Sequence, residues 1–278
     1  MHMIFNSAGR IGLILILFFT ITGLLAPVLS PYNPNDYTGA PLQKPDKNHW
    51  LGTNDLGQDI LSELIWGARI SVFIGLAVGT FSMVIATGVA LAAGVAGGRT
   101  DRILMRTADL FLAFPRLPSI IVIAAYLDSG IGNIIFVLLL FSWAKGARII
   151  RSQVLSLMKQ PHIEACVLFG ATRRYIILRH ILPEILPLSA FKFVKSSSYA
   201  MIAEAGLAFL SIGDPTAKSW GMMFHHIHSY PGIYCSDVWI WWFCPPAICL
   251  MLCILGFLFI GYSLEGIANP QIKTPQIT

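Results

Sequence analysis

The chain has 278 residues, of which 55% are hydrophobic and only 12% are charged. Soluble domains usually carry about 25% charged residues, so this composition excludes an ordinary soluble globular protein and indicates a membrane protein. The formal net charge of +5 would suggest nucleic-acid binding in a soluble chain. Here the basic residues gather between the apolar runs, as they do in the cytoplasmic loops of membrane proteins, and no nucleic-acid partner is expected.

Long apolar runs predict an all-α membrane protein with six transmembrane helices. A run of roughly 18 or more apolar residues crosses a bilayer as a helix, and it lacks the alternating pattern of a membrane β-barrel. The third expected crossing should enter the membrane with a kink, because Pro115 and Pro118 interrupt it. The second has small residues at four-residue spacing, which predicts close contact with another helix. In chain order, the expected crossings are residues 11–29, 70–98, 110–127, 131–147, 185–210 and 238–262.

The basic residues also predict how the chain is oriented. Segments 98–109 and 145–184 hold ten lysines and arginines, whereas the loops expected on the other side, 31–68 and 211–237, hold three. Since basic loops stay in the cytoplasm, both termini and segment 145–184 are expected there. The chain then divides into an N-terminal end with the first helix (1–30), an extracytoplasmic loop (31–69), a core with the other five helices (70–262) and a cytoplasmic tail (263–278).

A polar segment at residues 159–184 lies between two apolar runs. Pro161 suits the first turn of a helix, and Ile163, Val167 and Leu168 follow at helical spacing, which predicts a short amphipathic helix. Gly170 allows a chain break, and a second short helix is expected to end before Pro183. Two short helices joined at a glycine could fit a cleft on a partner protein. Equally, they could lie at the membrane surface with their arginines among lipid head groups.

This segment resembles the coupling, or "EAA", motif of ABC-importer permeases. The ending at residues 179–183 is similar to the dipeptide, oligopeptide and nickel branch, and Cys166 occupies the place of the usual second alanine. Residues 49–62 resemble the branch's extracytoplasmic H-x-L/F-G-T-D-x-x-G-R-D signature, with Gln58 where arginine is common. Further matches lie within 97–115 and 208–221, whereas residues 261–265 depart from the family's usual ending. The residues that match the coupling motif itself are Glu164, Ala165, Gly170, Leu182 and Pro183.

The resemblance implies a type I ABC-importer permease fold, and specifically the C-type member of a heteromeric pair. Such a subunit forms half of a pathway for dipeptides or oligopeptides, or alternatively for nickel or another chelated metal. It implies a second homologous permease, two ABC ATPase subunits that bind ATP and Mg, and an extracytoplasmic solute-binding protein, in a bacterial or archaeal cytoplasmic membrane. No catalytic residue or cofactor is expected in this chain, which lacks a Gly-x-x-x-x-Gly-Lys-Ser/Thr loop. The implied ATPase-coupling residues are Glu164, Ala165, Gly170, Arg174, His180, Leu182 and Pro183.

Two sets of side chains allow more than one interpretation. Glu204 lies within an expected crossing, where a carboxylate is costly, so it should either face the translocation pathway or bond to groups on neighbouring helices. His225, His226 and His228 are close together in an expected outer loop. Imidazoles at this density could bind a metal ion, but a flexible loop without supporting partners favours a surface that contacts the binding protein or membrane lipid.

Lys192 and Lys195 lie near the inner end of the fifth expected crossing and are expected to reach the cytoplasmic surface. Two other function classes stay open at this point. A secondary transporter would carry inverted repeats, but no repeat relates residues 11–127 to 134–262. A membrane metalloenzyme could use the outer histidines, but it lacks a carboxylate base and paired ligands on rigid elements.

Overall fold

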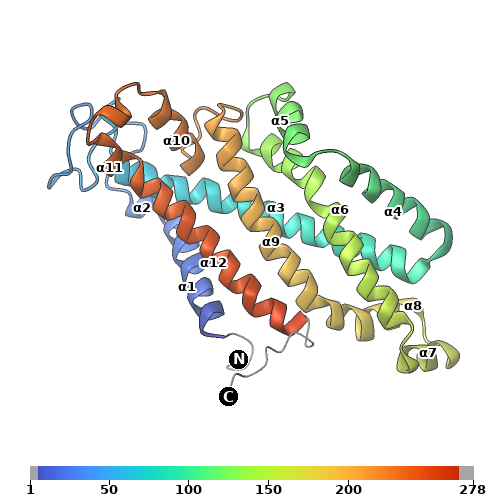
Figure 1. Ribbon diagram of the computed structural model, residues 1–278. Helices are drawn as coiled ribbons and strands as arrows, with labels where there is room; N and C mark the ends of the chain where they lie inside the picture. Colours follow the sequence, from blue (N-terminus) through green and yellow to red (C-terminus); the bar gives the residue numbers. More distant parts are fainter. Residues whose placement is uncertain (1–5, 269–278) are drawn as a thin grey trace, which may run out of the picture.

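The computed structural model describes residues 6–268, with the side chains of Tyr234 and of residues 266–268 left aside. Its regular structure is helical, and the only β pairing in this part of the chain is an isolated bridge between Thr53 and Asp59. Figure 1 shows the helices as one elongated bundle. The longer helices are α1 (Ser7–Leu24), α3 (Ile60–Ala96), α4 (Gly98–Ala113), α5 (Arg116–Tyr126), α6 (Ile131–Met158), α9 (Leu182–Phe209), α10 (Trp220–Ser229) and α12 (Cys244–Ala268). The shorter elements are α2 (Ala26–Leu29), α7 (Pro161–Leu168), α8 (Arg173–Ile176), η1 (Ile177–Ile181), η2 (Ile233–Cys235) and α11 (Val238–Trp242).

Length and apolar composition identify four helical stretches in this part of the chain that can cross a membrane: α1, α3, α6 and the stretch from α11 through α12. The pair α4–α5 passes the same test jointly but bends by 87°, so it is a broken span or a re-entrant segment. Helix α9 is long enough, but it carries Lys192, Lys195 and Glu204 together with several serines. The six crossings expected from the sequence are therefore confirmed for four or five, and the sixth stays a prediction.

The segment around the third expected crossing differs from the prediction. Residues 98–109 were expected to form a loop, but they belong to helix α4, which ends at Ala113. Pro115 then occupies the N-cap position of α5, whose first turn contains Pro118. Charges on one face of α4 made an amphipathic helix look like a loop, which is why that prediction was wrong. The predicted kink at the two prolines is confirmed, and it is a sharp bend between two helices.

Helix α3 lies in the centre of the bundle and contacts α1, α6 and α9. Its small residues allow this, as their spacing predicted. A Cβ atom added at Gly94 would lie 2.5 Å from Val154 Cγ1 on α6, and one added at Gly79 would lie 3.1 Å from the backbone oxygen of Phe193 on α9. Larger residues at these positions would push the helices apart.

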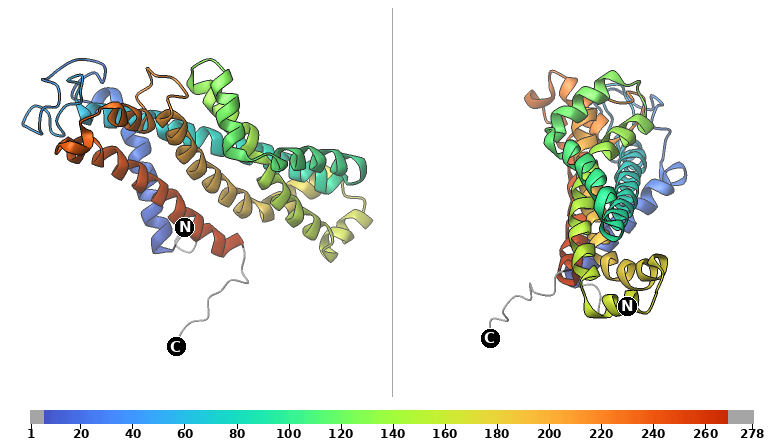
Figure 2. Two further views of the ribbon diagram at one scale, coloured as in Figure 1. Left: turned by 45° about the horizontal axis from the view of Figure 1, so that its top comes forward. Right: turned by 90° about the vertical axis from the view of Figure 1, so that its right-hand side faces the viewer.

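Helices α1 and α12 pack side by side along one flank of the bundle (Figures 1 and 2). Their backbones nearly touch, because a Cβ atom at Gly12 would lie 2.5 Å from the carbonyl oxygen of Gly256. At the end of this flank, the Asn6 backbone N–H donates to Ser263 Oγ at 3.3 Å. The described ends of the chain therefore meet, on the same side of the bundle as α7 (Figure 1).

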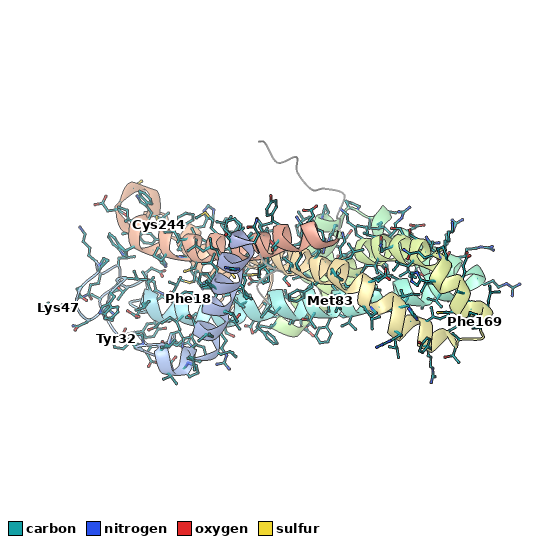
Figure 3. All side chains as sticks on the ribbon, turned by 90° about the horizontal axis from the view of Figure 1, so that it is seen from below. Phe18, Tyr32, Lys47, Met83, Phe169 and Cys244 are labelled. Atoms are coloured by element: carbon teal, nitrogen blue, oxygen red, sulfur yellow. The ribbon has the colours of Figure 1, made fainter. Side chains whose placement is uncertain are left out.

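The opposite end of the bundle carries the segment 30–59, α10 and α11 (Figure 1). Figure 3 shows Lys47 of this end and Phe169 of the α7 end at opposite extremes of the molecule. The helix bounds differ slightly from two boundaries expected from the sequence, and the division into domains stays a prediction. Helix α3 starts at Ile60, so it includes the last part of the expected loop 31–69, and α12 continues to Ala268. The rest of the expected tail, 269–278, lies outside the described residues.

Candidate functional site

The segment 159–184 forms a compact projection at one end of the bundle, which we call the knob (Figure 1). Pro161 occupies the first turn of α7, as expected. The chain reverses at Gly170, whose φ of 80° is in the left-handed region that favours glycine. There the Gly170 N–H donates to the Val167 carbonyl and the Ala171 N–H to the Cys166 carbonyl, both at 3.0 Å. These bonds satisfy the carbonyls at the end of α7.

Buried isoleucines attach the knob to the bundle. Ile163 of α7 and Ile176 of α8 pack with residues of α3 and α6, among them Ala90 and Val154. The tip of the knob carries exposed apolar side chains, which the sequence did not predict. Leu168 is 86% exposed and Phe169 is 92% exposed, and Figure 3 shows Phe169 at the tip.

The second helix of the knob does not end before Pro183, contrary to the prediction. A π-helical turn, η1, follows α8 and leads directly into α9, whose first turn contains Pro183. Because proline has no N–H to donate and its ring pushes against the preceding turn, a wider turn before it keeps the helix continuous. The knob is therefore joined to α9 without a loop.

The structure brings the predicted coupling residues together on this knob. Glu164 and Arg174 are exposed on α7 and α8, respectively, and Ala165 is half-buried. His180 lies with its Nε2 3.7 Å from Cys166 Sγ, which links η1 to α7. Leu182 is half-buried and Pro183 is exposed where α9 begins. Their role in ATPase coupling stays a prediction.

Glu204 is far from the knob and is only 1% exposed. Its Oε2 accepts a hydrogen bond from Ser71 Oγ of α3 at 3.3 Å, and the same hydroxyl accepts the backbone N–H of Trp220 at 3.2 Å. Glu204 thus joins α9, α3 and the start of α10. This arrangement favours the second interpretation of this residue, bonding to neighbouring helices; contact with the transported solute stays a prediction.

The three outer histidines lie on helix α10, so the expectation of a flexible loop was wrong. His225 Nδ1 lies 3.0 Å from the Phe209 carbonyl oxygen, its ring centroid is 5.7 Å from that of His226, and the His228 ring packs against Phe209. Within residues 6–268, no group of three or more His, Cys, Asp or Glu side chains is placed to hold a metal ion.

A polar cluster fastens the outer segment to α3, and sequence reasoning missed its central residue. Lys218 Nζ donates to Glu63 Oε1 at 2.6 Å and to Gln58 Oε1 at 2.8 Å. Nearby, the Asp59 side chain caps α3 and contacts His49 Nδ1 at 2.9 Å. The signal was indirect: where the family signature carries arginine, this chain has Gln58, and Lys218 supplies a cation from elsewhere in the sequence.

Replacement of Lys218 by methionine is expected to destabilise the fold by about 3–5 kcal/mol, because it leaves the carboxylate of Glu63, which is 2% exposed, without its partner. Thermal unfolding of the purified protein in detergent measures the effect. The exposed Lys44→Met is the matched control and should change little, and Glu63→Gln added to Lys218→Met should restore much of the loss. An unfolding temperature for Lys218→Met equal to that of the control would contradict the role of the pair.

Comparisons with known proteins agree with this architecture. Residues 84–274 match the family described as "Binding-protein-dependent transport system inner membrane component", and residues 4–46 match the "N-terminal TM domain of oligopeptide transport permease C". A solved structure of the MetNI methionine ABC transporter, in inward-facing conformations, matches with a TM-score of 0.57 at 17% identity, and covers 75% of this chain and 98% of that chain. At this level of identity, the likeness shows a shared fold and nothing about function.

Curated relatives match over nearly the whole chain. The oligopeptide transport system permease protein OppC of Bacillus subtilis (strain 168) is 32% identical over 273 residues, which is 96% of this chain and 87% of the relative. The dipeptide transport system permease protein DppC of the same strain is 30% identical, covering 96% and 83%. The nickel transport system permease protein NikC of Escherichia coli (strain K12) is 30% identical, covering 95% of both chains. The chain therefore belongs to the family of binding-protein-dependent transport system inner membrane components, and it is a transmembrane permease subunit of an ABC importer.

Proposed function

We propose that this permease forms half of a pathway for dipeptides or oligopeptides, together with a second homologous permease. A solute-binding protein delivers the peptide to the outer end, and two ATPase subunits bind ATP and Mg at the cytoplasmic end. The observation that carries this proposal is the knob, whose apolar tip is exposed while its base is held by buried isoleucines. Such a tip favours a protein partner, because large exposed apolar patches mark interaction sites.

The join between knob and bundle supports a mechanical role. Because η1 and α9 form one continuous helical stretch, a displacement of the knob passes directly to α9. Helix α9 in turn packs against α3, α10 and α12. Closure of the ATPases on ATP would thus move the knob and open the pathway outward, with Glu164 and its neighbours at the contact. No residue of this chain takes part in covalent chemistry in this scheme.

The orientation follows from charge. The knob and the described ends of the chain lie on one side of the bundle (Figure 1), and the knob holds seven basic residues together with the end of α6. Basic segments of this kind stay in the cytoplasm. Both termini are accordingly assigned to the cytoplasm, and the segment 30–59 with α10 to the outside, where the binding protein docks.

Peptide is the favoured substrate class because OppC and DppC are named for oligopeptide and dipeptide transport. Nickel is the second candidate because NikC is similarly related. The test measures solute transport by the complete importer reconstituted in vesicles. ATP is supplied on the side of the membrane where the ATPases are bound. ATP-dependent accumulation of a labelled peptide supports the proposal. Accumulation that follows an ion gradient without ATP would refute it, and accumulation of nickel alone would assign the second substrate.

A further inference from the structure

A cavity of about 420 Å³ lies between α5, α6 and α9, about halfway along the last two helices. Its walls include aromatic and hydroxyl side chains but no carboxylate. Four of its residues are cationic: Arg116, Lys145, Lys192 and Lys195. Among residues 6–268, none of these four takes part in an ion pair with an acidic side chain. The cavity therefore carries a net positive charge, which Glu265, an exposed residue of α12 outside the lining, offsets only in part.

Arg116 occupies a built position in this cavity. Its Nη2 donates to Ser142 Oγ at 2.6 Å, and its guanidinium carbon lies 3.5 Å from the centroid of the Tyr199 ring. These contacts fix the plane of the guanidinium group but do not use all of its donors. Arg116 Nε and the Tyr199 hydroxyl are buried without a hydrogen-bond partner within the described residues. Unpaired buried donors are costly unless something accepts from them.

The charges in this cavity argue against a lipid-facing wall. Cations within the hydrocarbon region face the interior of a protein or a water-filled path, and four of them repel one another unless an anion lies between them. Helix α3 packs on both α6 and α9 but contributes no residue to the cavity. The cavity thus opens on the side of these two helices that α3 leaves uncovered. The expectation that Lys192 and Lys195 merely extend to the cytoplasmic surface does not account for this cluster.

We propose that the cavity binds a carboxylate group of the transported solute as it passes along the pathway wall; this assignment rests on the proposed function. A planar guanidinium held on an aromatic ring matches a carboxylate, and lysines add charge without strict geometry. The volume suits part of a small solute. Every unmodified peptide ends in a carboxylate, so such a site accepts peptides whatever their sequence. The same four charges repel an uncomplexed metal cation.

The phosphate of an anionic lipid is the other anion that basic pockets between membrane helices bind. The two sources are separated by binding measurements on the complete importer, purified in nanodiscs of neutral phosphatidylcholine or of phosphatidylcholine with phosphatidylglycerol. The probes are trialanine as the free acid and trialanine amide. Tighter binding of the acid in both kinds of nanodisc supports the assignment. No preference for the acid, or a preference that appears only when phosphatidylglycerol is absent and vanishes on its addition at unchanged peptide concentration, overturns it.

Variants locate the effect. Lys192→Gln combined with Lys195→Gln should weaken binding and uptake of the acid by about tenfold, since a hydrogen bond to a charged group contributes that much or more, and should leave the amide unchanged. Lys192→Arg with Lys195→Arg keeps both charges and should retain the preference. The control, Arg99→Gln with Arg102→Gln, removes two exposed charges outside the cavity. If the glutamine variant keeps the wild-type ratio of affinities for the acid and the amide, the assignment is wrong.

Failure of this inference and failure of the proposed function give different results. If the importer accumulates trialanine with ATP but the glutamine variant treats acid and amide as the wild type does, the function stands and the carboxylate site does not. If no preparation accumulates either peptide with ATP, the proposed function itself fails. The amount of folded complex, measured by gel filtration, shows that each variant was tested as an intact assembly.

Discussion

Replacing Gly170 by proline is expected to abolish ATP-driven uptake while the protein still inserts in normal amounts. Proline holds φ near about −65°, whereas Gly170 has a φ of 80°. The substitution also removes the N–H that donates to Val167. The turn between α7 and α8 must then reorganise at a cost of about 3 kcal/mol or more, which displaces the exposed tip from its partner. Uptake of labelled peptide and the quantity of protein in the membrane are measured together.

The control for this prediction is Gly170→Asn. A Cβ atom at Gly170 would meet no atom within 4 Å, and asparagine adopts the left-handed region more readily than other non-glycine residues. The asparagine variant should therefore transport at close to the wild-type rate. Normal uptake by a well-expressed proline variant would show that the geometry of this turn is unimportant for coupling.

Truncation of the tip is expected to release the ATPase. Leu168 and Phe169 are the most exposed large apolar side chains of the knob, and full burial of such a side chain stabilises a contact by about 1.5–3 kcal/mol. Leu168→Ala with Phe169→Ala should thus weaken ATPase binding by more than about a hundredfold. Retention of the ATPase on the tagged permease, and its dissociation constant by titration, measure this loss.

The matched control is Tyr126→Ala with Leu127→Ala, which truncates an aromatic and a leucine side chain at the end of α5, away from the knob (Figure 1). This variant should keep its ATPase. If the tip variant binds the ATPase as tightly as this control does, the knob contacts something else, and the membrane surface becomes the better interpretation of what it contacts. Binding to vesicles of anionic lipid would then test that alternative.

Much of the fold could be predicted because long apolar runs and proline positions act locally. The bend at Pro115, the start of α7 at Pro161 and the close packing at Gly94 all follow from the properties of single residues and their spacing. The exceptions have a common cause, which is polarity. Helix α4 was predicted as a loop because of its charges, and the histidines of α10 were placed in a loop because polar side chains hid a helix that packs on α9.

The sequence was enough to predict which residues belong to the candidate site, but not which side of the knob is buried and which is exposed. Residues 159–184 contain the matching motif, yet which side of α7 is buried depends on Ile163 finding residues of α3 and α6. That contact is set by tertiary structure, so the exposure of Leu168 could not be predicted. Likewise, Lys218 and Glu63 are separated by 155 positions, and no local pattern connects them.

The contact between Gly12 and Gly256 affects how the protein is made. Chain synthesis delivers α1 to the membrane long before α12, so the glycine face of α1 initially borders lipid, with only its α3 side able to find a partner in the meantime. Closure of this flank has to wait until the final helix leaves the translocon. Ribosomes that stall or terminate early would leave an incomplete bundle whose open seam quality-control proteases could recognise.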